Sequence, residues 1–459
     1  MGGNRRMAIA EEAFPCYIKK IYLFFDLKGK TMEQNAFDVL RERGFIYQCT
    51  AESELHELLG KEKVRFYVGF DPTGNSLHVG HLLPVMAMRI MQKCGHTPIG
   101  LVGGATALVG DPSGKSTARP ILSKEEVAHN VECLKAQLQR FISVDNAIFT
   151  NNAEWFSNML YLDFLRDIGS KFSVNRMLQA ESVQMRLNSE VGVSFLEFNY
   201  MILQGYDFLH LYRTHGCRLQ LGGQDQWGNI TCGTELVRRL EQNSVYGLTM
   251  PLLMDKDGNK FGKSNGQAVW LDANRYSTFD YYQFWRNTDD SQVEKLMLGF
   301  TALPVDEIKR LCAPGGNINR AKEILAYEAT ALAHGKAEAE KVFCAAGTKF
   351  GFADEAGAIP TTSEIAKIDL AAVRRVAAAD LPTFKLELPA EGINIITLLV
   401  QAGLCKTNSE ARRLIQGGGA YCGDERIATI DRMVTAADFT DGALILKAGK
   451  KNLKRIVVE

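Results

Sequence analysis

The chain has 459 residues, of which 46% are hydrophobic and 23% charged, a balance typical of a globular protein with roughly two to four domains. Its 53 basic and 53 acidic residues cancel, so net charge neither indicates nor excludes a nucleic-acid partner, because a local basic surface suffices to bind phosphates. The ten cysteines contain no CxxC pair, and no run of about eighteen apolar residues occurs. This argues against a zinc site, a disulfide framework and a membrane span, and it favours a reducing cytoplasm.

Residues 1–31 fit none of the usual targeting signals. Their apolar run at Ile21–Phe25 is too short and too late for a secretory signal, and Glu11 and Asp26 suit a transit peptide poorly. Met32 then opens a helical pattern. We interpret residues 1–31 as an extension of unclear role.

The next region alternates between apolar strands and helices. Strands are predicted at Val64–Phe70, Thr97–Thr106 and Leu219–Leu221. A helix from about Leu77 to Gln92 separates the first two, and another follows the third through Leu240. This order predicts an open α/β domain with a parallel sheet over residues 32–265, whose ligands bind at the carboxyl ends of the strands.

The composition and periodicity of the remaining chain change twice. Residues 266–345 have a helical pattern, as at Ile318–Ala333, and residues 346–390 are predicted to be a linker because Gly, Ala, Pro and Thr are frequent. A last domain is predicted at residues 391–459. Its elements would be helices at Asn394–Ala402 and Ser409–Gln416 and a strand at Ala443–Lys447.

The segment His78-Val-Gly-His81 follows a predicted strand and loop and opens a helix. A helix start offers free N–H groups and a positive dipole end, which suit a phosphate, and two imidazoles could donate to it. Gly80 would let a flat base approach the backbone. Alone, the pattern also fits two surface histidines and a chance glycine.

The segment Lys260-Phe-Gly-Lys263-Ser264 lies in a loop rich in Asp, Gly and Lys. Two lysines on a mobile loop can close over a triphosphate and stabilise charge in the transition state. Standing alone, the loop would be interpreted as a solvated turn.

The segment Gly110-Asp-Pro-Ser-Gly-Lys-Ser116 nearly spells a P-loop. That motif needs four residues between its glycines and this segment has three, so we reject it. Asp111 could instead hold an ammonium group, and Lys115 and Arg119 could reach phosphates. A plain solvated turn fits equally well.

Tyr200, Gln204 and Asp207 follow one another at spacings of four and three in a largely apolar helical pattern, which places them on one helix face. A buried carboxylate there needs partners, because an unpaired one is costly. Gly222-Gly-Gln-Asp-Gln226 follows a predicted strand and could contact a ribose. A solvated helix face and a simple turn are the competing interpretations.

Together these motifs resemble the class I aminoacyl-tRNA synthetases, specifically the bacterial-type tyrosyl enzymes, over nearly the whole chain from Met32. His78–His81 is similar to the family's HIGH signature. Lys260–Ser264 is similar to its KMSKS signature, with Phe261 and Gly262 in place of Met and Ser and both lysines kept. Two signatures in this order, about 180 residues apart, are far more specific than either alone.

The resemblance implies roles residue by residue. Tyr67 and Asp207 would hydrogen-bond the phenol hydroxyl of the substrate. The ammonium and carboxylate would be held by Asp111, Tyr200, Gln204 and Gln226. ATP would be bound by Gly69, Asp71, His81, Gly223, Asp225 and Lys263. Charge in the transition state would be stabilised by Thr73, His78, His81, Lys260, Lys263, Lys115 and Arg119.

The implied chemistry begins with attack of the tyrosine carboxylate on the α-phosphate of ATP. That nucleophile is already ionised at neutral pH, so catalysis rests on positioning and charge stabilisation and not on a general base. Mg²⁺ would accompany ATP, and no metal site made by the protein is expected. The terminal ribose of tRNA then attacks the adenylate.

The resemblance also implies an architecture: a Rossmann-like catalytic domain, a helical domain on the anticodon side, and a small α+β RNA-binding domain like one in a ribosomal small-subunit protein. Arg412 and Arg413 of that last domain would face phosphates. Residues 152–179 are similar to the family's dimer-forming segment, so a homodimer that binds tRNA(Tyr), tyrosine and ATP, and no membrane, is expected.

Three alternatives remain open at this point. A tryptophanyl synthetase shares both signatures, although Tyr67 with Asp207 favours a phenol over an indole. A small-molecule nucleotidyltransferase can carry HxGH but has no need of an RNA-binding tail. A non-catalytic RNA-binding relative would have no use for both signatures.

Overall fold

The computed structural model describes residues 34–113, 122–188, 192–254, 258, 260–264, 267–373, 383–423, 425–439, 442–449 and 452–458. Residues 1–31, Lys115 and Arg119 therefore lie outside the described part, and of Lys263 only the backbone is described. The chain divides into two compact units, Met1–Phe343 with Ile359–Ala366 and Cys344–Ala358 with Lys367–Glu459.

A six-stranded sheet forms the centre of the first unit, in the order β1-β6-β5-β2-β3-β4. All neighbouring pairs are parallel except β1 with β6. The strands are β1 (Gln48–Cys49), β2 (Arg65–Phe70), β3 (Thr97–Val102), β4 (Ile148–Asn151), β5 (Cys217–Gly223) and β6 (Tyr246–Met250). The three predicted strands are thus confirmed as β2, β3 and β5, and the predicted open parallel sheet is confirmed with them.

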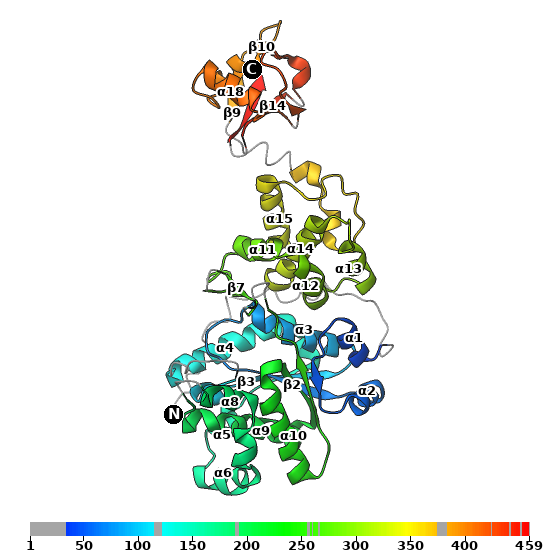
Figure 1. Cartoon of the computed structure of the whole chain (residues 1–459), viewed down its shortest axis with the longest axis vertical. Coiled ribbons are helices and arrows are strands. Elements are labelled where there is room, and N and C mark those ends of the chain that lie inside the picture. Colours follow the sequence, from blue (N-terminus) through cyan, green and yellow to red (C-terminus); the bar gives the residue numbers. More distant parts are fainter. Residues whose placement is uncertain are drawn as a thin grey trace, which may run out of the picture. The chain divides into compact units, whose positions relative to one another are not determined.

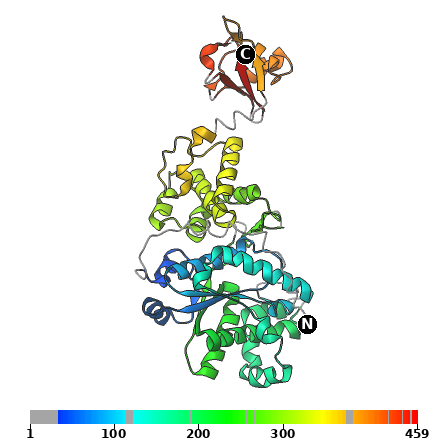
Figure 2. The same cartoon turned by 180° about the vertical axis from the view of Figure 1, so that it is seen from behind.

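Helices cover both faces of this sheet, which is why its inner strands are apolar on both sides. On one face lie α3 (Val79–Lys93) and α4 (Lys124–Phe141), and on the other α9 (Phe195–His215) and α10 (Trp227–Glu241) (Figure 1). From behind, the long cyan α4 runs across the sheet (Figure 2). Side chains of His78, Ser123 and Ser194 cap α3, α4 and α9.

Shorter helices complete the first part of this unit. Near its start are α1 (Ala36–Glu42) and α2 (Glu52–Lys61), and between β4 and α9 are α5 (Ala153–Phe156), α6 (Tyr161–Asp167), α7 (Val174–Leu178) and α8 (Glu181–Leu187). From β2 the chain continues to β3, which pairs with one edge of β2, whereas β5 and β6 lie on the other side of β2. The sheet order therefore reverses at β2, and the crevice above β2 and β5 is where such sheets bind ligands.

The predicted helical region follows the two-stranded hairpin β7 (Lys263–Ser264) and β8 (Gln267–Ala268). Its helices are α11 (Thr278–Arg286), α12 (Val293–Phe300), α13 (Val305–Leu311), α14 (Ile318–His334) and α15 (Lys336–Phe350). α14 is buried along most of its length and packs against α11 and α12. Among the helices of the described residues, none is both long and apolar enough to cross a membrane.

The second unit contains a five-stranded sheet in the order β12-β11-β14-β15-β9 and a pair β10-β13. Its elements are β9 (Thr383–Leu386), β10 (Ile393–Asn394), α17 (Ile395–Gln401), α18 (Asn408–Gln416), β11 (Ala420–Cys422), β12 (Glu425–Arg426), β13 (Met433–Val434), β14 (Ala443–Ala448) and β15 (Asn452–Val458). The predicted helices and the strand are confirmed as α17, α18 and β14. The predicted linker of residues 346–390 contains regular elements, because α15 continues to Phe350, the 3-10 helix η7 (Glu364–Lys367) follows, and β9 adds a parallel edge strand to the sheet.

Candidate active site

A cavity of about 690 Å³ opens at the carboxyl ends of β2, β3 and β5. Every predicted site residue whose side chain the structure describes lines it: Tyr67, Gly69, Asp71, Thr73, His78, His81, Asp111, Tyr200, Gln204, Asp207, Gly223, Asp225, Gln226 and Lys260. The cavity has a buried inner end at α9 and an outer end at the start of α3.

The inner end is built around Asp207 of α9, which is only 2% exposed. Trp155 Nε1 donates to its Oδ1 at 3.0 Å, and Asn152 Nδ2 donates to its Oδ2 at 3.2 Å. Burial raises the pKa of Asp207 well above its usual value, and the two donors oppose that shift. Tyr67 on β2 is also buried, and its hydroxyl has no hydrogen-bond partner among the described residues. Burial, and then the charge of Asp207, raise the pKa of Tyr67.

Hydrogen bonds connect this end to Asp71, which follows β2. Asn152 Nδ2 donates to Thr106 Oγ1 at 3.0 Å, and Thr106 Oγ1 donates to Asp71 Oδ1 at 2.8 Å. The Tyr200 hydroxyl donates to Asp71 Oδ2 at 2.8 Å. Gly103 is required here, since a Cβ at that position would lie 2.2 Å from Asp71 Oδ1. The Asp71 carboxylate is therefore held by side chains of two elements, the 3-10 helix η2 (Thr106–Leu108) and α9.

A second network lies at the carboxyl end of β5. Gln226 Nε2 donates to Asp111 Oδ2 at 2.7 Å. Asn229 Nδ2 donates to Gln226 Oε1 and to Gln204 Oε1, each at 3.1 Å. The Asp111 carboxylate also accepts from Ser113 N at 2.9 Å. These contacts bring together polar side chains from three separate predicted motifs.

The two histidines begin α3 at the outer end. His78 is the N-cap residue, and its Nδ1 accepts from Gly80 N at 3.0 Å. His81 Nδ1 accepts from His78 N at 3.1 Å, and the two rings stack with centroids 3.9 Å apart. Because each Nδ1 accepts a hydrogen bond, a neutral ring carries its proton on Nε2 and donates from there. Both rings thus act as donors at the positive end of a helix.

The Lys260–Ser264 segment lies directly against this helix start. A Cβ on Gly262 would be 3.1 Å from Gly80 N, and the Gly262 φ of +96° lies in the region that favours glycine. The Phe261 ring packs on Trp285, with centroids 5.7 Å apart. The two departures from the KMSKS pattern therefore have local causes, one in backbone conformation and one in packing.

A cation and a carboxylate face each other between the two ends. Lys260 Nζ lies 3.5 Å from Asp225 Oδ2, with the lysine side chain 46% exposed and the aspartate side chain 23% exposed. Burial raises the pKa of Asp225, and Lys260 opposes the shift.

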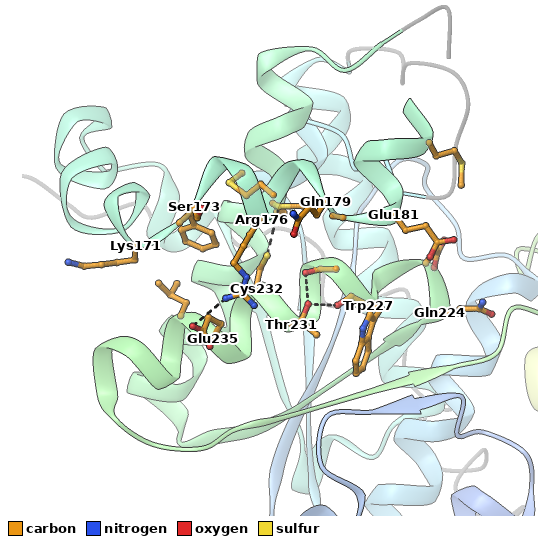
Figure 3. Close-up of a pocket in the computed structure, with 18 of the residues that line it drawn as sticks. Lys171, Ser173, Arg176, Gln179, Glu181, Gln224, Trp227, Thr231, Cys232 and Glu235 are labelled. Atoms are coloured by element: carbon orange, nitrogen blue, oxygen red, sulfur yellow. Dashed lines mark hydrogen bonds and ion pairs between the residues drawn. The ribbon is translucent and has the colours of Figure 1, made fainter. Parts of the chain in front are cut away.

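A second cavity of about 470 Å³ shares Asp225 and Lys260 with the first. Figure 3 shows it between α7, α8 and α10, with Arg176 pointing toward Glu235. The Arg176 Nη1 and Glu235 Oε1 atoms are 3.6 Å apart, and Arg239 Nε lies 2.7 Å from the same oxygen. Hydrogen bonds from arginines on α10 lower the pKa of Glu235 to about 2. The Glu235 carboxylate, which lies on α10, thus links α10 to Arg176 of α7.

Sequence reasoning missed several polar residues of the site, among them Thr106, Asn152, Trp155 and Asn229. Their spacing gave no signal, because their partners are far away in the sequence; Asn152 and Asp207, for example, are 55 residues apart. The one usable hint was position, since Asn152 directly follows a strand.

Comparisons with known proteins identify the family of this chain. The family described as tRNA synthetases class I (W and Y) matches residues 59–350, and a tyrosine–tRNA ligase SYY-like C-terminal domain matches residues 374–456. The tyrosine–tRNA ligase of Clostridium kluyveri is 46% identical over 93% of this chain and all of that protein. The tyrosine–tRNA ligase of Clostridium tetani is 48% identical over the same shares.

A solved structure is also similar. The C-terminally truncated Aspergillus nidulans mitochondrial tyrosyl-tRNA synthetase has a TM-score of 0.60 and 31% identity, covering 68% of this chain and 92% of that one. The family resemblance seen in the motifs is thereby confirmed. The chain belongs to the class I tRNA synthetases, in the family of tyrosine–tRNA ligases.

Proposed function

We propose that the cavity binds L-tyrosine and ATP, forms tyrosyl-adenylate and pyrophosphate, and transfers tyrosine to the 3′ end of tRNA(Tyr). The observation that carries this proposal is the pair at the inner end of the cavity. Asp207 is a buried acceptor, and Tyr67 has a buried hydroxyl that lacks a partner among the described residues. A ligand hydroxyl between them satisfies both groups.

This pair favours tyrosine over its closest competitors. Phenylalanine brings no hydroxyl, so a buried carboxylate and a buried hydroxyl stay without a ligand partner, at a cost of about 1–3 kcal/mol per group. An indole is wider than a phenol and cannot place a hydroxyl there. The names of the curated relatives support the same choice over tryptophan.

The rest of the amino acid points along the cavity toward the nucleotide. The ammonium group is held by Asp111, Tyr200 and Gln204, and the carboxylate lies near Gln226. The networks that fix these side chains support this assignment, because pre-positioned partners lower the entropic cost of binding.

The nucleotide occupies the outer end of the cavity. Gly69, Asp71, Gly223 and Asp225 contact ATP, and His81 lies near its phosphates. Charge that builds on the phosphates is stabilised by Nε2–H donors of His78 and His81, by Thr73, and by cations from two loops: Lys115 and Arg119 after β3, and Lys260 and Lys263 in the Lys260–Ser264 segment. Such donors stabilise the transition state more than the ground state, which raises kcat.

Mg²⁺ arrives with the triphosphate as part of the substrate. Within the described residues, no group of three or more His, Cys, Asp or Glu side chains could hold a metal ion. Triphosphate oxygens are the hard ligands that Mg²⁺ prefers.

A homodimer forms through the helices between β4 and α9. More than half of the exposed large apolar side chains of the described residues fall in this segment or at the start of α9: Leu160, Tyr161, Leu162, Val174, Met185, Leu187, Phe195 and Leu196. Exposed apolar clusters of this kind mark interaction sites. Leu162→Asp is expected to shift the species seen by light scattering from dimer to monomer, while Val144→Asp, exposed outside the segment, leaves it unchanged.

The C-terminal unit binds RNA through exposed cations on α18. Arg412 and Arg413 are exposed on α18.

The cysteines of the described residues are all free, which supports a reducing cytoplasm. Within this scheme, residues 32–265 form the catalytic domain, 266–345 the helical domain and 391–459 the RNA-binding domain.

The direct test is ATP–pyrophosphate exchange with each of the twenty amino acids, without tRNA. Exchange with tyrosine alone supports the proposal, and charging of tRNA(Tyr) completes it. Exchange with tryptophan would overturn the assignment of Tyr67 and Asp207. Absence of exchange with every amino acid would overturn the proposed reaction.

A further inference from the structure

Residues 269–271 connect the two signature regions through their backbone. Val79 N donates to Val269 O at 2.9 Å, and Leu271 N donates to Leu77 O at 2.9 Å. Val269 N in turn donates to Gly262 O at 2.9 Å. One short segment therefore touches the start of α3 on one side and the Lys260–Ser264 segment on the other.

The side chain at the centre of this segment, Trp270, contacts the N-cap residue of α3 and Arg275. Its ring lies edge-on to His78, with centroids 5.8 Å apart. The guanidinium carbon of Arg275 lies 3.5 Å from the centroid of the Trp270 ring. Arg275 Nη1 also donates to Asn75 Oδ1 at 2.8 Å. Asn75 belongs to the loop that links Thr73 to His78.

The loop that links Thr73 to His78 also packs on the stacked side chains of Trp270 and Arg275. A Cβ built on Gly74 would be 3.6 Å from Trp270 Cη2 and 3.7 Å from Arg275 Nη1, which is ordinary contact distance. The loop backbone at Gly74 thus lies against both side chains. Thr73 and Asn75, on either side of Gly74, are exposed. Arg275 therefore contacts the loop in two ways, by packing against its backbone at Gly74 and by its hydrogen bond to Asn75.

We propose that Arg275, stacked on Trp270, is a positioning residue for adenylate formation: it holds the loop of Thr73 and the ring of His78 in register with the Lys260–Ser264 segment. The inference rests on the proposed function of the cavity. Arg275 itself touches no substrate in this scheme. Its part is to fix donors that act in the transition state, where small misplacements reduce rate strongly.

The shape of the side chain matters as much as its charge. A guanidinium is planar, stacks on an aromatic face and still donates at its edge, whereas an ammonium on a flexible stem cannot do both. Arg275→Lys is therefore expected to behave like Arg275→Ala. A residue that acted on phosphate by charge alone would be rescued by lysine.

The test compares tyrosine-dependent ATP–pyrophosphate exchange in the full chain and its variants. Arg275→Ala and Arg275→Lys are each expected to lower kcat about three- to tenfold with the KM for tyrosine unchanged, as for an interaction realised only in the transition state. Asn75→Ala is expected to give a smaller loss, and the double variant Asn75→Ala with Arg275→Ala to lose no more than Arg275→Ala alone.

Arg41→Ala is the matched control. Arg41 is also exposed, lies over an aromatic ring (Phe37, at 4.8 Å) and makes one side-chain contact with Glu52, but it is remote from the cavity. The kcat of Arg41→Ala should equal that of the parent chain, and the melting temperatures of all variants should agree with that of the parent chain. An unchanged kcat in Arg275→Ala, or full rescue by lysine, would overturn the inference. Lack of exchange in the parent chain would instead overturn the proposed function.

Discussion

The two ends of the active-site cavity are built in opposite ways. At the inner end, Asp207 is 2% exposed and accepts hydrogen bonds from two side chains that come from a different part of the chain. At the outer end, the donors are helix-start groups and loop residues, and the Lys260 side chain is 46% exposed. One end is fixed by buried side chains, and the other is assembled from surface loops.

This difference follows from what each end has to do. Recognition of a hydroxyl needs a desolvated partner in one fixed position, because the discrimination comes from leaving that partner unsatisfied. Stabilisation of a departing pyrophosphate needs groups that admit the triphosphate and then close on it, and such groups belong on loops. Substitutions at the inner end should therefore change specificity, and those at the outer end should change rate.

The largest effect is expected at the inner end. Asp207→Ala should reduce the preference for tyrosine over phenylalanine, as the ratio of kcat/KM in the exchange assay, by about a hundredfold or more, because the acceptor for the hydroxyl is gone. Asp306→Ala, an exposed carboxylate on α13, should leave the ratio unchanged. A preference unaltered in Asp207→Ala would mean that the phenol binds elsewhere.

The outer end should show the reverse pattern. His81→Ala is expected to lower kcat about a hundredfold, the usual effect of removing one transition-state donor, with little change in tyrosine preference. His56→Ala provides the control, since that histidine pairs with Asp38 on the surface. If His81→Ala changed the tyrosine-to-phenylalanine ratio instead of kcat, the division of labour between the two ends would be wrong.

A smaller effect tests the support behind Asp207. Asn152→Ala removes one donor to this carboxylate and one to Thr106, and we expect kcat/KM for tyrosine to fall about tenfold. The KM for ATP should change less than the KM for tyrosine, because Asn152 reaches Asp71 only through Thr106. Asn243→Ala, whose side chain donates on the surface to Glu241 O, is the control. An equal rise in both KM values would show that Asn152 supports the whole cavity and not its inner end.

The smallest effect concerns the backbone of the outer end. Gly262→Ser brings the segment one letter closer to KMSKS, yet we expect kcat to fall about threefold to fivefold, because a side chain at φ +96° is strained and its Cβ would press on Gly80 N. Gly258→Ser, also at positive φ but with open space around it, separates the strain from the contact. A faster Gly262→Ser variant would contradict this conformation.

Much of the fold was predictable because its signals are local. Apolar runs of strand length and helical periodicity are read within one segment, and β2, β3, β5, α14, α17 and α18 were found this way. β6 was missed although it is entirely buried. Its second residue, Gly247, is a poor strand former that is needed for packing, since a Cβ there would lie 2.2 Å from Ile230 Cγ2.

The sequence alone determined which chemical groups the site contains: two histidines at a helix start, a lysine-rich loop, and a tyrosine and an aspartate suited to a phenol. Tertiary structure alone decided how they are held. Trp155 and Asn152 reach Asp207 from 52 and 55 positions away, and Arg275 reaches Asn75 across 200. Such pairs leave no periodicity in the chain, because a hydrogen bond depends on distance in space, and only the folded sheet brings these segments within reach.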